Sequence, residues 1–356
     1  MKIAFLGDIA FVGQFDITKN PNLREQLAPM AEYLSGFDLV VANLESPFTE
    51  KKHSMVCKGI HVKTSPKNAE LLKFLHVDVV SLANNHMFDY SRKGYEDTVL
   101  ALENQGISYF GINGKIHREE MDGNCLKFMG YCCYTANGTR YRSETKTDYI
   151  TPVLEEEIIS AISEDHCLPI VSIHWGDENV NYPRYEHIRF ARSLAERGTF
   201  LLHGHHPHAL QGMEKRGESL IAYSLGNFCF DEMDSHSVKG LKNKMQKMNR
   251  QGCVLAVTVE NNQITDYECK TFTFGDGGMD FVPNEEFPAY SEALLMEENV
   301  YVPMRQAALA ESLKHISTGK KNLSWIFKRL NYYFIGAVLK GRRNQKNYQK
   351  TFRFLR

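Results

Sequence analysis

The sequence predicts an α/β fold with substantial parallel strand pairing, on three observations. Short apolar runs typical of buried strands recur along the chain. Stretches with helical periodicity separate them, and strands that alternate with helices indicate crossover connections between parallel neighbours. Finally, polar residues capable of binding a metal directly follow several of the apolar runs.

The expected elements follow in chain order. The strands are expected at 2–7, 38–42, 78–82, 107–110, 126–131, 168–173, 199–203 and 219–224. The helices between them are expected at about 66–76, 91–105, 155–165 and 184–197. Beyond residue 250 the pattern changes to two strands, Cys253–Glu260 and Gln263–Phe274. The Asn261-Asn262 pair between them predicts a hairpin turn.

The composition is that of an ordinary globular protein, but its charge is unevenly distributed. The chain has 356 residues, of which 43% are hydrophobic and 24% charged, and its net charge is −1. The stretch from Ser312 to Arg356 holds 12 Lys and Arg and no Asp or Glu, whereas the rest carries 30 basic and 43 acidic side chains. A basic tail on an acidic body favours an anionic partner for the tail.

The cysteines and the N-terminus predict a cytoplasmic protein. Eight cysteines form no Cys-x-x-Cys pair, and several lie in apolar runs, as in Phe228-Cys229-Phe230. We therefore expect them to be reduced and buried. The N-terminus enters a strand at once and lacks the apolar region of a signal peptide. No apolar run is long enough to span a membrane.

Metal-ligand residues follow five of the expected strands. They are Asp8, then Asn43 and Glu45, then Asn85, His86 and Asp89, then His174, and finally His206 and His208. Each alone fits a structural role, such as a helix cap, and a solvated histidine-rich loop is the alternative for 203–208. Because active sites gather beyond the carboxyl ends of parallel strands, the set together predicts a metal site.

The ligand types predict one or two divalent metal ions. Glu45 is the expected bridge between two ions, which lie roughly 3.5–4 Å apart in known two-metal sites. Asp8 and His208 complete one expected shell, and Asn85, His174 and His206 the other. Mixed nitrogen and oxygen ligands suit Mn, Fe or Zn rather than Ca. His86 is the expected catalytic residue, as a general acid or oxyanion stabiliser.

A second group of residues is expected to bind substrate or to support the ligands. It comprises Asn43, Ser46, Asp89, Trp175, Glu178 and Asn227. Asn43 and Ser46 flank the expected bridge, and such neighbours orient metal ligands. Trp175 and Glu178 follow His174 and are expected either to wall a substrate or to cap and pack the loop. Asn227 lies near a strand end, where a turn-stabilising role is the alternative.

The motifs in this order resemble those of the CapA family. The most specific are Leu82-Ala83-Asn84-Asn85-His86, His205-His206-Pro207-His208 and Tyr223-Ser224-Leu225-Gly226-Asn227-Phe228. CapA proteins are linked to capsule and poly-γ-glutamate synthesis and are relatives of calcineurin-like metallophosphoesterases. The resemblance runs from Met1 to about Phe274. It implies a four-layer α/β/β/α metallophosphoesterase-like sandwich with metals at its crest.

The chain departs from the phosphoesterase pattern at two positions. Ala10 stands where a histidine is usual, which removes an imidazole from one metal. Glu45 stands where a bridging aspartate is usual, which changes the reach of the bridge. The resemblance implies a metal-dependent hydrolase that acts on a phosphoester or a cell-surface polymer bond. The alternative is a non-catalytic accessory protein that binds an anionic polymer in a capsule-synthesis complex. The absence of the usual histidine at position 10 favours this alternative.

The C-terminal part is expected to be a separate extension. We expect a CapA-like domain at 1–280 and a helical, basic C-terminal extension at 281–356. Within the segment 322–356, an apolar stretch with aromatic residues precedes Lys and Arg, a pattern of helices that lie in a membrane interface. The alternative is a helix docked on the acidic body. Nucleic-acid binding is not expected, because no nucleic-acid motif accompanies the charge.

Overall fold

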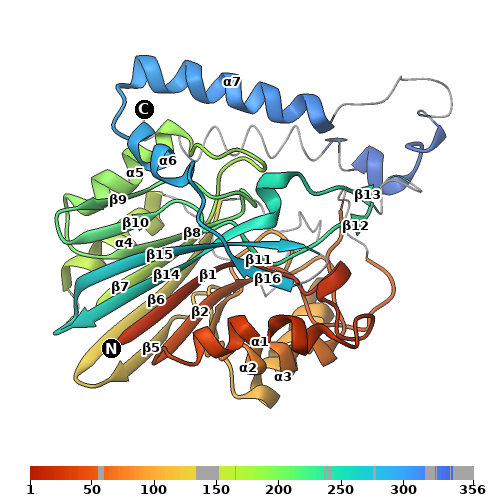
Figure 1. The fold of residues 1–356 in the computed structure, drawn as a ribbon, viewed down its shortest axis with the longest axis horizontal. Coiled ribbons are helices and arrows are strands. Elements are labelled where there is room, and N and C mark those ends of the chain that lie inside the picture. The colour runs from red at the N-terminus through yellow and green to blue at the C-terminus, as the bar shows by residue number, and fades with distance from the viewer. Residues whose placement is uncertain are drawn as a thin grey trace.

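The chain folds into two facing β-sheets whose outer faces are covered by helices (Figure 1). The computed structural model describes residues 1–54, 60–133, 152–164, 166–235, 238, 242–275, 278–316, 325, 327–336 and 338–339. The resulting layers are helix, sheet, sheet and helix. The four-layer α/β/β/α architecture expected from the sequence is therefore confirmed.

The first sheet is parallel in one half and antiparallel in the other. Its order is β16 (Gly278–Phe281), β15 (Gln263–Gly275), β14 (Gln251–Glu260), β1 (Lys2–Ile9), β2 (Leu39–Leu44), β3 (Val79–Ser81) and β4 (Ser108–Phe110). Strands β1 to β4 pair in parallel, and β11 (Asn227–Cys229) also pairs in parallel with β1. The carboxyl ends of β1, β2 and β3 consequently share one edge.

The second sheet has a parallel centre. Its order is β5 (His117–Met121), β6 (Asn124–Cys132), β7 (Leu168–His174), β8 (Leu201–His205), β10 (Ser219–Ala222) and β9 (Met213–Arg216). Strands β6, β7, β8 and β10 are parallel to their neighbours in this central part. A small separate ribbon pairs β12 (Met233–Asp234) with β13 (Lys242–Asn243).

Three apolar cores separate the layers. One contains side chains of both sheets, such as Ile3 and Phe5 from β1 with Ile170 from β7. A second packs the other face of β1, including Ala4 and Leu6, against α1 (Leu23–Leu34), α2 (Ala69–Phe74) and α3 (Ser91–Gln105). The third packs β7 and β8 against α4 (Pro152–Glu164), α5 (Tyr185–Ala195), α6 (Phe287–Ala293) and α7 (Glu298–Ile316). Because β1 is buried on both faces, its sequence is a continuous apolar run.

Most expected elements are present within a few residues of their predicted bounds. All eight expected strands and the helices at 91–105, 155–165 and 184–197 form. The expected helix at 66–76 is a 3-10 turn at Pro66–Asn68 followed by α2. The hairpin is also confirmed. Asn261 and Asn262 have φ of 52° and 61°, the left-handed values that a two-residue hairpin turn requires.

The structure corrects the expectation that all the cysteines are reduced. Cys125 forms a disulfide with Cys167, and Cys253 forms one with Cys269 across β14 and β15. Cys132, Cys133 and Cys229 are buried and form no disulfide with another described residue, as predicted, and Cys57 lies outside the described residues. The sequence signal failed because half-cystines on neighbouring strands need no short spacing. Disulfides persist mainly in oxidising compartments, so the cysteines no longer support a cytoplasmic location.

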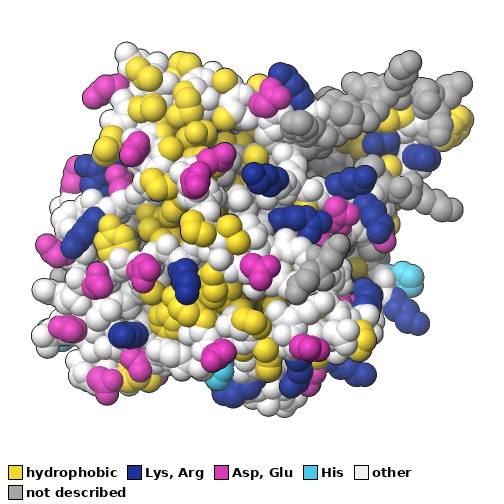
Figure 2. Space-filling view, viewed as in Figure 1, with side chains coloured by type: hydrophobic (Ala, Val, Ile, Leu, Met, Phe, Trp, Pro, Cys, Tyr) yellow, Lys and Arg dark blue, Asp and Glu magenta, His cyan; other side chains and the backbone are white. Residues whose placement is uncertain are grey.

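The first part of the C-terminal region packs on the body. Tyr301 of α7 is fully buried and its hydroxyl donates a hydrogen bond to the Pro183 carbonyl at 2.8 Å. Arg305 of α7 pairs with Asp177, on the loop after β7. On the face drawn in Figure 2, acidic and basic side chains intermingle at the left, and Lys and Arg are more frequent at the right. Among the described residues, no helix is long and apolar enough to cross a membrane.

Candidate metal centre

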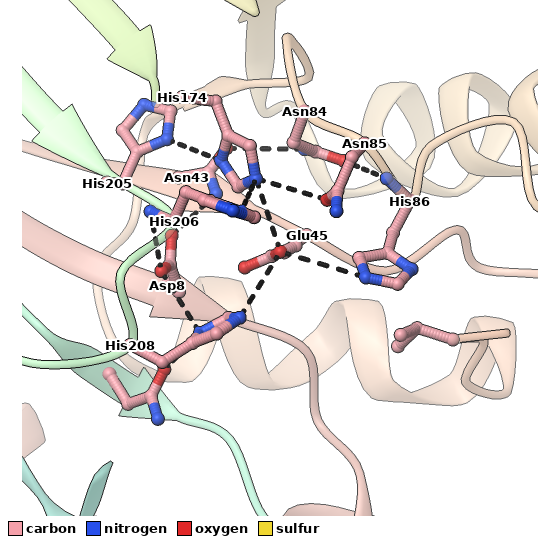
Figure 3. A network of polar contacts seen from close by, with 12 residues as sticks. Asp8, Asn43, Glu45, Asn84, Asn85, His86, His174, His205, His206 and His208 are labelled. Atoms are coloured by element: carbon pink, nitrogen blue, oxygen red, sulfur yellow. Dashed lines mark hydrogen bonds and ion pairs between the residues drawn. The ribbon is translucent and has the colours of Figure 1, made fainter. Parts of the chain in front are cut away.

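The carboxyl ends of both sheets bring the expected ligands to one place (Figure 3). Asp8 lies in β1, and Glu45 directly follows β2. His174 ends β7, and His206 and His208 follow β8. Gly7 allows β11 to approach β1, because a Cβ atom at this position would overlap the Gly226 carbonyl oxygen. The sheet edges thus meet in a single buried polar cluster.

Three potential ligand atoms converge on the Nε2 atom of His174 and form with it a set of four. His206 Nδ1 lies 2.9 Å from it, Asn85 Oδ1 3.1 Å and Glu45 Oε1 3.4 Å. Ligand atoms held about 2.1 Å from one ion are separated by about 3.0 Å at a right angle and about 3.4 Å at a tetrahedral angle. The observed spacings match those values. Each of these three spacings is compatible with a shared divalent ion, and Glu45, His174 and His206 each place one ligand atom within 4.8 Å of the others.

A second donor set shares Glu45 but is looser. Asp8 Oδ2 lies 3.4 Å from His208 Nδ1, whereas Glu45 Oε1 lies 3.7 Å from His208 Nε2. Asp8, Glu45 and His208 each place one ligand atom within 4.8 Å of the others. Ala10 is buried in a small apolar cluster with Val12, Val62 and Phe230 and supplies no ligand. This set accordingly fits a second ion with fewer donors.

The backbone that carries His206 and His208 adopts conformations that L-residues rarely adopt. Their φ angles are 101° and 54°. Asn249 holds this turn, since its Nδ2 donates to the His208 carbonyl at 2.9 Å and to Asn179 Oδ1 at 2.7 Å. Asn227 Oδ1 lies 2.9 Å from His208 Nδ1. Such strain persists only where the surroundings fix it, and it typically marks functional sites.

A buried chain of polar groups extends from His174 into the space between the sheets. His174 Nδ1 lies 2.9 Å from His205 Nδ1, and His205 Nε2 lies 2.8 Å from Ser172 Oγ. Ser172 Oγ is 3.5 Å from His203 Nδ1, and His203 Nε2 is 2.8 Å from the Leu6 carbonyl oxygen. Every member of the chain is fully buried.

The Leu6 carbonyl at one end of this row of hydrogen-bonded groups fixes the position of each proton along the row. The Leu6 carbonyl can only accept, so His203 Nε2 carries a proton and its Nδ1 accepts from Ser172. Ser172 then accepts from His205 Nε2, and His205 Nδ1 accepts from His174 Nδ1. Neutral His174 is left with its Nε2 lone pair directed at the compact donor set. This is the tautomer that a metal ligand requires.

The protonation states support this assignment. Burial lowers the pKa of His206 and of His203 to about 4, and it lowers the pKa of His174 and His205 well below the usual value. These imidazoles are therefore neutral at pH 7. Burial would raise the pKa of Asp8, but its contacts with His208 and Asn43 lower it to about 2. A carboxylate and neutral imidazoles are the forms that bind metals.

His208 differs from the other histidines of the cluster. Burial would lower its pKa, but the charges of Glu45 and Asp8 and the hydrogen bond to Asp8 raise the pKa to about 10. In the absence of a metal, His208 is therefore a cation that pairs with the two carboxylates. A bound metal takes over this charge-balancing role and displaces the proton.

His86 lies at the edge of the cluster and is held by Asp89. Asp89 Oδ2 accepts a hydrogen bond from His86 Nδ1 at 2.6 Å and another from the Val62 amide at 2.8 Å. His86 Nε2 consequently points inward, 4.0 Å from Glu45 Oε1. Asn84 fixes the turn, because its Oδ1 accepts from the His86 amide at 3.1 Å.

A cavity of about 280 Å³ opens over the cluster. It is lined by His86 and by two of the proposed ligands, Asn85 and His208. Its remaining lining combines polar and apolar side chains and comprises Ile60, Glu178, Asn179, Asn227, Phe230, Asp231, Met233, Asn243, Lys244, Met245 and Asn249. A substrate in this cavity would contact the metal centre and His86 together.

The structure separates the expected supporting residues by role. Asn43 Nδ2 donates to Asp8 Oδ1 at 2.7 Å, and Glu178 lines the cavity. Ser46 follows Glu45, and its hydroxyl donates to the Ala10 carbonyl at 2.6 Å. The expectation that Trp175 walls a substrate is corrected: its ring is fully buried and stacks on His187 at 4.4 Å between centroids. The Trp175 ring packs in the core beneath the helices, which agrees with the alternative that it caps and packs the loop.

Sequence reasoning missed four contributors. They are His205, Ser172 and His203 of the buried chain, and Asn249, which holds the His208 turn. The period-2 pattern of β8 places His203 and His205 on one face, which was an available signal. Asn249 lies more than 40 residues from His208 in sequence, and no pattern connects the two.

A family comparison identifies the chain. The model of the family described as "Bacterial capsule synthesis protein PGA_cap" matches residues 2–232. The chain belongs to this family. The matched region includes all the proposed ligands and His86, and it ends before the hairpin of β14 and β15. The expected CapA relationship is thereby confirmed.

Two curated relatives are similar to this PGA_cap-family chain. The PGA biosynthesis protein CapA of Bacillus subtilis is 29% identical over 245 residues, which cover 65% of this chain and 64% of the relative. The capsule biosynthesis protein CapA of Bacillus anthracis is 29% identical over 217 residues, which cover 57% and 53%. The chain thus matches between half and two thirds of the length of these relatives.

Among solved structures, the chain is similar to a putative 5'-nucleotidase from Staphylococcus aureus in complex with alpha-ketoglutarate. The sequence identity is 11%, the TM-score is 0.47, and the match covers 83% of this chain and 58% of the nucleotidase. At this TM-score the similarity carries no argument about function.

Proposed function

We propose that this protein is a metal-dependent hydrolase that acts on a phosphoester, or on a bond of a cell-surface polymer or its precursor, in capsule or poly-γ-glutamate synthesis. The observation that supports it best is the compact donor set around His174 Nε2, with spacings of 2.9–3.4 Å beneath an open cavity. Relatives named for capsule and PGA biosynthesis supply the context.

The residues divide the work in a defined way. Glu45, Asn85, His174 and His206 would hold one ion, and Asp8, Glu45 and His208 a second, with Mn, Fe or Zn suited to these ligands. Such ions lower the pKa of bound water and polarise the bond to be cleaved. His86 would donate a proton to the leaving group from Nε2, while Asp89 stabilises its imidazolium form. Glu178 and Asn227 would contact substrate in the cavity.

The second candidate is an accessory protein that binds an anionic polymer without turnover. Ala10 favours it, because the looser donor set lacks an imidazole there. A single tightly held ion would still bind phosphate or carboxylate groups. It would not supply the second ion that two-metal hydrolysis requires.

Two measurements test these candidates in sequence. The metal content of the purified wild type is compared with that of His206→Ala/His208→Ala by elemental analysis, where bound Mn, Fe or Zn should be lost in the variant. Phosphodiester and amide substrates are then assayed with wild type and His86→Ala. Hydrolysis that His86→Ala abolishes while metal content is unchanged supports the hydrolase. Polymer binding that survives His86→Ala, without turnover by the wild type, supports the accessory role.

A further inference from the structure

A C-terminal apolar segment, residues 325–339 with 326 and 337 not described, presents large apolar side chains to solvent. In Figure 1 it is drawn in dark blue at the right of the view. Its exposed side chains are 43–71% accessible and comprise Phe327, Leu330, Tyr332, Ile335, Val338 and Leu339. Residues 332–336 are helical. Soluble proteins rarely gather so many exposed apolar side chains in one short segment without a binding role.

The opposite face of this segment is anchored to the body. The Tyr333 hydroxyl donates to the Ser54 carbonyl at 2.9 Å, and the Tyr333 ring contacts the His61 ring at 5.3 Å between centroids. Within the segment, the Arg329 guanidinium lies over the Trp325 ring at 4.1 Å. The apolar side chains therefore face outward from a docked segment.

The charge around the segment complements an anionic surface. Lys328 is exposed within it, and the sequence from Ser312 to Arg356 holds 12 Lys and Arg with no acidic residue. Lys and Arg side chains also gather on the right of the face in Figure 2, where apolar side chains of the molecule's edge lie among them. Apolar and basic side chains together bind an anionic membrane interface, because the first enter the acyl boundary and the second contact headgroups.

We propose that the C-terminal apolar segment binds the surface of a membrane that contains anionic lipid. The side chains of Phe327, Leu330 and Ile335 enter the interface, and the exposed Lys328 contacts phosphate headgroups. His61, which touches the segment, follows Ile60 of the cavity lining. Binding therefore brings the cavity close to the lipid surface. This proposal is independent of the proposed hydrolase activity.

Vesicle binding by the full chain tests it. Wild type is sedimented with vesicles of phosphatidylcholine alone and of phosphatidylcholine mixed with phosphatidylglycerol, at low and high salt. We expect binding to the mixed vesicles only, weaker at high salt. The variant Phe327→Ser/Leu330→Ser/Ile335→Ser should bind at least about tenfold more weakly, because three apolar side chains no longer enter the interface.

Matched controls keep the outcome interpretable. Leu295→Ser/Val300→Ser removes two side chains that are 73% and 55% exposed away from the segment, and it should bind as the wild type does. Equal binding by the triple variant and the wild type would overturn the proposal, as would no binding by the wild type. A dimer that the triple variant dissociates, in protein without vesicle affinity, would assign the segment to a second copy and also overturn it.

Discussion

His174 Nδ1 lies 2.9 Å from His205 Nδ1, so the proposed ligand is oriented from behind by a second buried imidazole. Because the chain ends on the Leu6 carbonyl, only one set of proton positions satisfies all its members when the histidines are neutral. That set turns the Nε2 lone pair of His174 toward Glu45, Asn85 and His206. The proposed ligand His174 is thus oriented by groups outside the compact donor set.

Replacing His205 should weaken metal binding. His205→Leu removes the acceptor for His174 Nδ1 and frees the ring to rotate or change tautomer. Loss of such a supporting partner typically weakens metal affinity by about 10–100-fold. The affinity is measured by competition with a chromophoric chelator, and the number of ions bound at saturation should not change.

His187→Leu provides the comparison for this variant. His187 is also fully buried, but it stacks on Trp175 away from the ligands. Its replacement should alter the free energy of unfolding without changing metal affinity. If both variants weakened the metal equally, general loosening of the core would explain the effect, and the orienting role of His205 would be rejected.

Metal binding should release a proton from His208. The pKa of His208 in the metal-free protein is raised to about 10, so the ring is protonated at neutral pH and must lose its proton to bind an ion. Affinity at this position should therefore increase with pH by up to about tenfold per unit between about pH 7 and 10. Calorimetry in two buffers of different ionisation enthalpy measures the released proton directly, and His208→Asn should abolish that release.

The same shift makes the stability of the metal-free protein depend on pH. The folded pKa of His208 lies above its unfolded value of about 6.5, so its stabilising contribution is fully present below about pH 6.5 and is lost as pH rises through about 10. Urea denaturation in the presence of a chelator should show this decline for wild type. A decline of the same size in His208→Asn would contradict the assignment.

The fold, and the gathering of the proposed ligands at one edge, followed from the sequence because both rest on local patterns. Buried strands such as β1 appear as apolar runs, and parallel pairing places residues that follow different strands, such as Asp8 and Glu45, at one edge. The short β9 and β12 were not predicted, because their sequences, Met213–Arg216 and Met233–Asp234, are mostly polar and form no apolar run.

The parts that were not predicted depend on contacts between distant residues. Asn249 supports His208 across a long sequence separation, and the disulfide partners Cys125 and Cys167 are 42 residues apart. Trp175 follows a ligand in sequence, but its ring turns into the core beneath α5. A residue that follows a ligand at a strand end therefore has its backbone near the site, but packing decides whether its side chain points toward the site or into the core.

The disulfide between Cys125 and Cys167 should contribute substantially to stability. It joins β6 to the start of β7 and closes a loop of 42 residues, for which the chain-entropy account gives about 4 kcal/mol. Urea denaturation of Cys125→Ala/Cys167→Ala should show a loss approaching that value. Peptide mapping of the non-reduced wild type should recover the Cys125–Cys167 and Cys253–Cys269 pairs. Free thiols at these four positions would show that the two disulfides do not form.

Arg305 of α7 should be needed to hold the loop after β7 over the cavity. Its Nε donates to the carbonyls of Tyr182 at 3.1 Å and Pro183 at 3.0 Å, and its guanidinium pairs with Asp177, next to Glu178 of the cavity lining. Arg305→Met removes this donor, although Tyr301 still donates to the Pro183 carbonyl and Arg184 still pairs with Asp177. We expect a loss of about 2–3 kcal/mol in the free energy of unfolding, because charged hydrogen bonds are removed at a largely buried site.

The pH dependence of that loss provides an internal check. Burial would raise the pKa of Asp177, but Arg184 and Arg305 lower it to about 2. Its stabilising contribution is therefore present above the unfolded pKa of about 3.8 and lost only as pH falls through about 2. The difference in the free energy of unfolding between wild type and Arg305→Met should be equal at about pH 5 and 7. The control Arg189→Met, at an exposed position, should show almost no loss.

Faster amide exchange at 177–184 in Arg305→Met would place the effect in the loop after β7. Unchanged exchange there would show that α7 does not hold this loop.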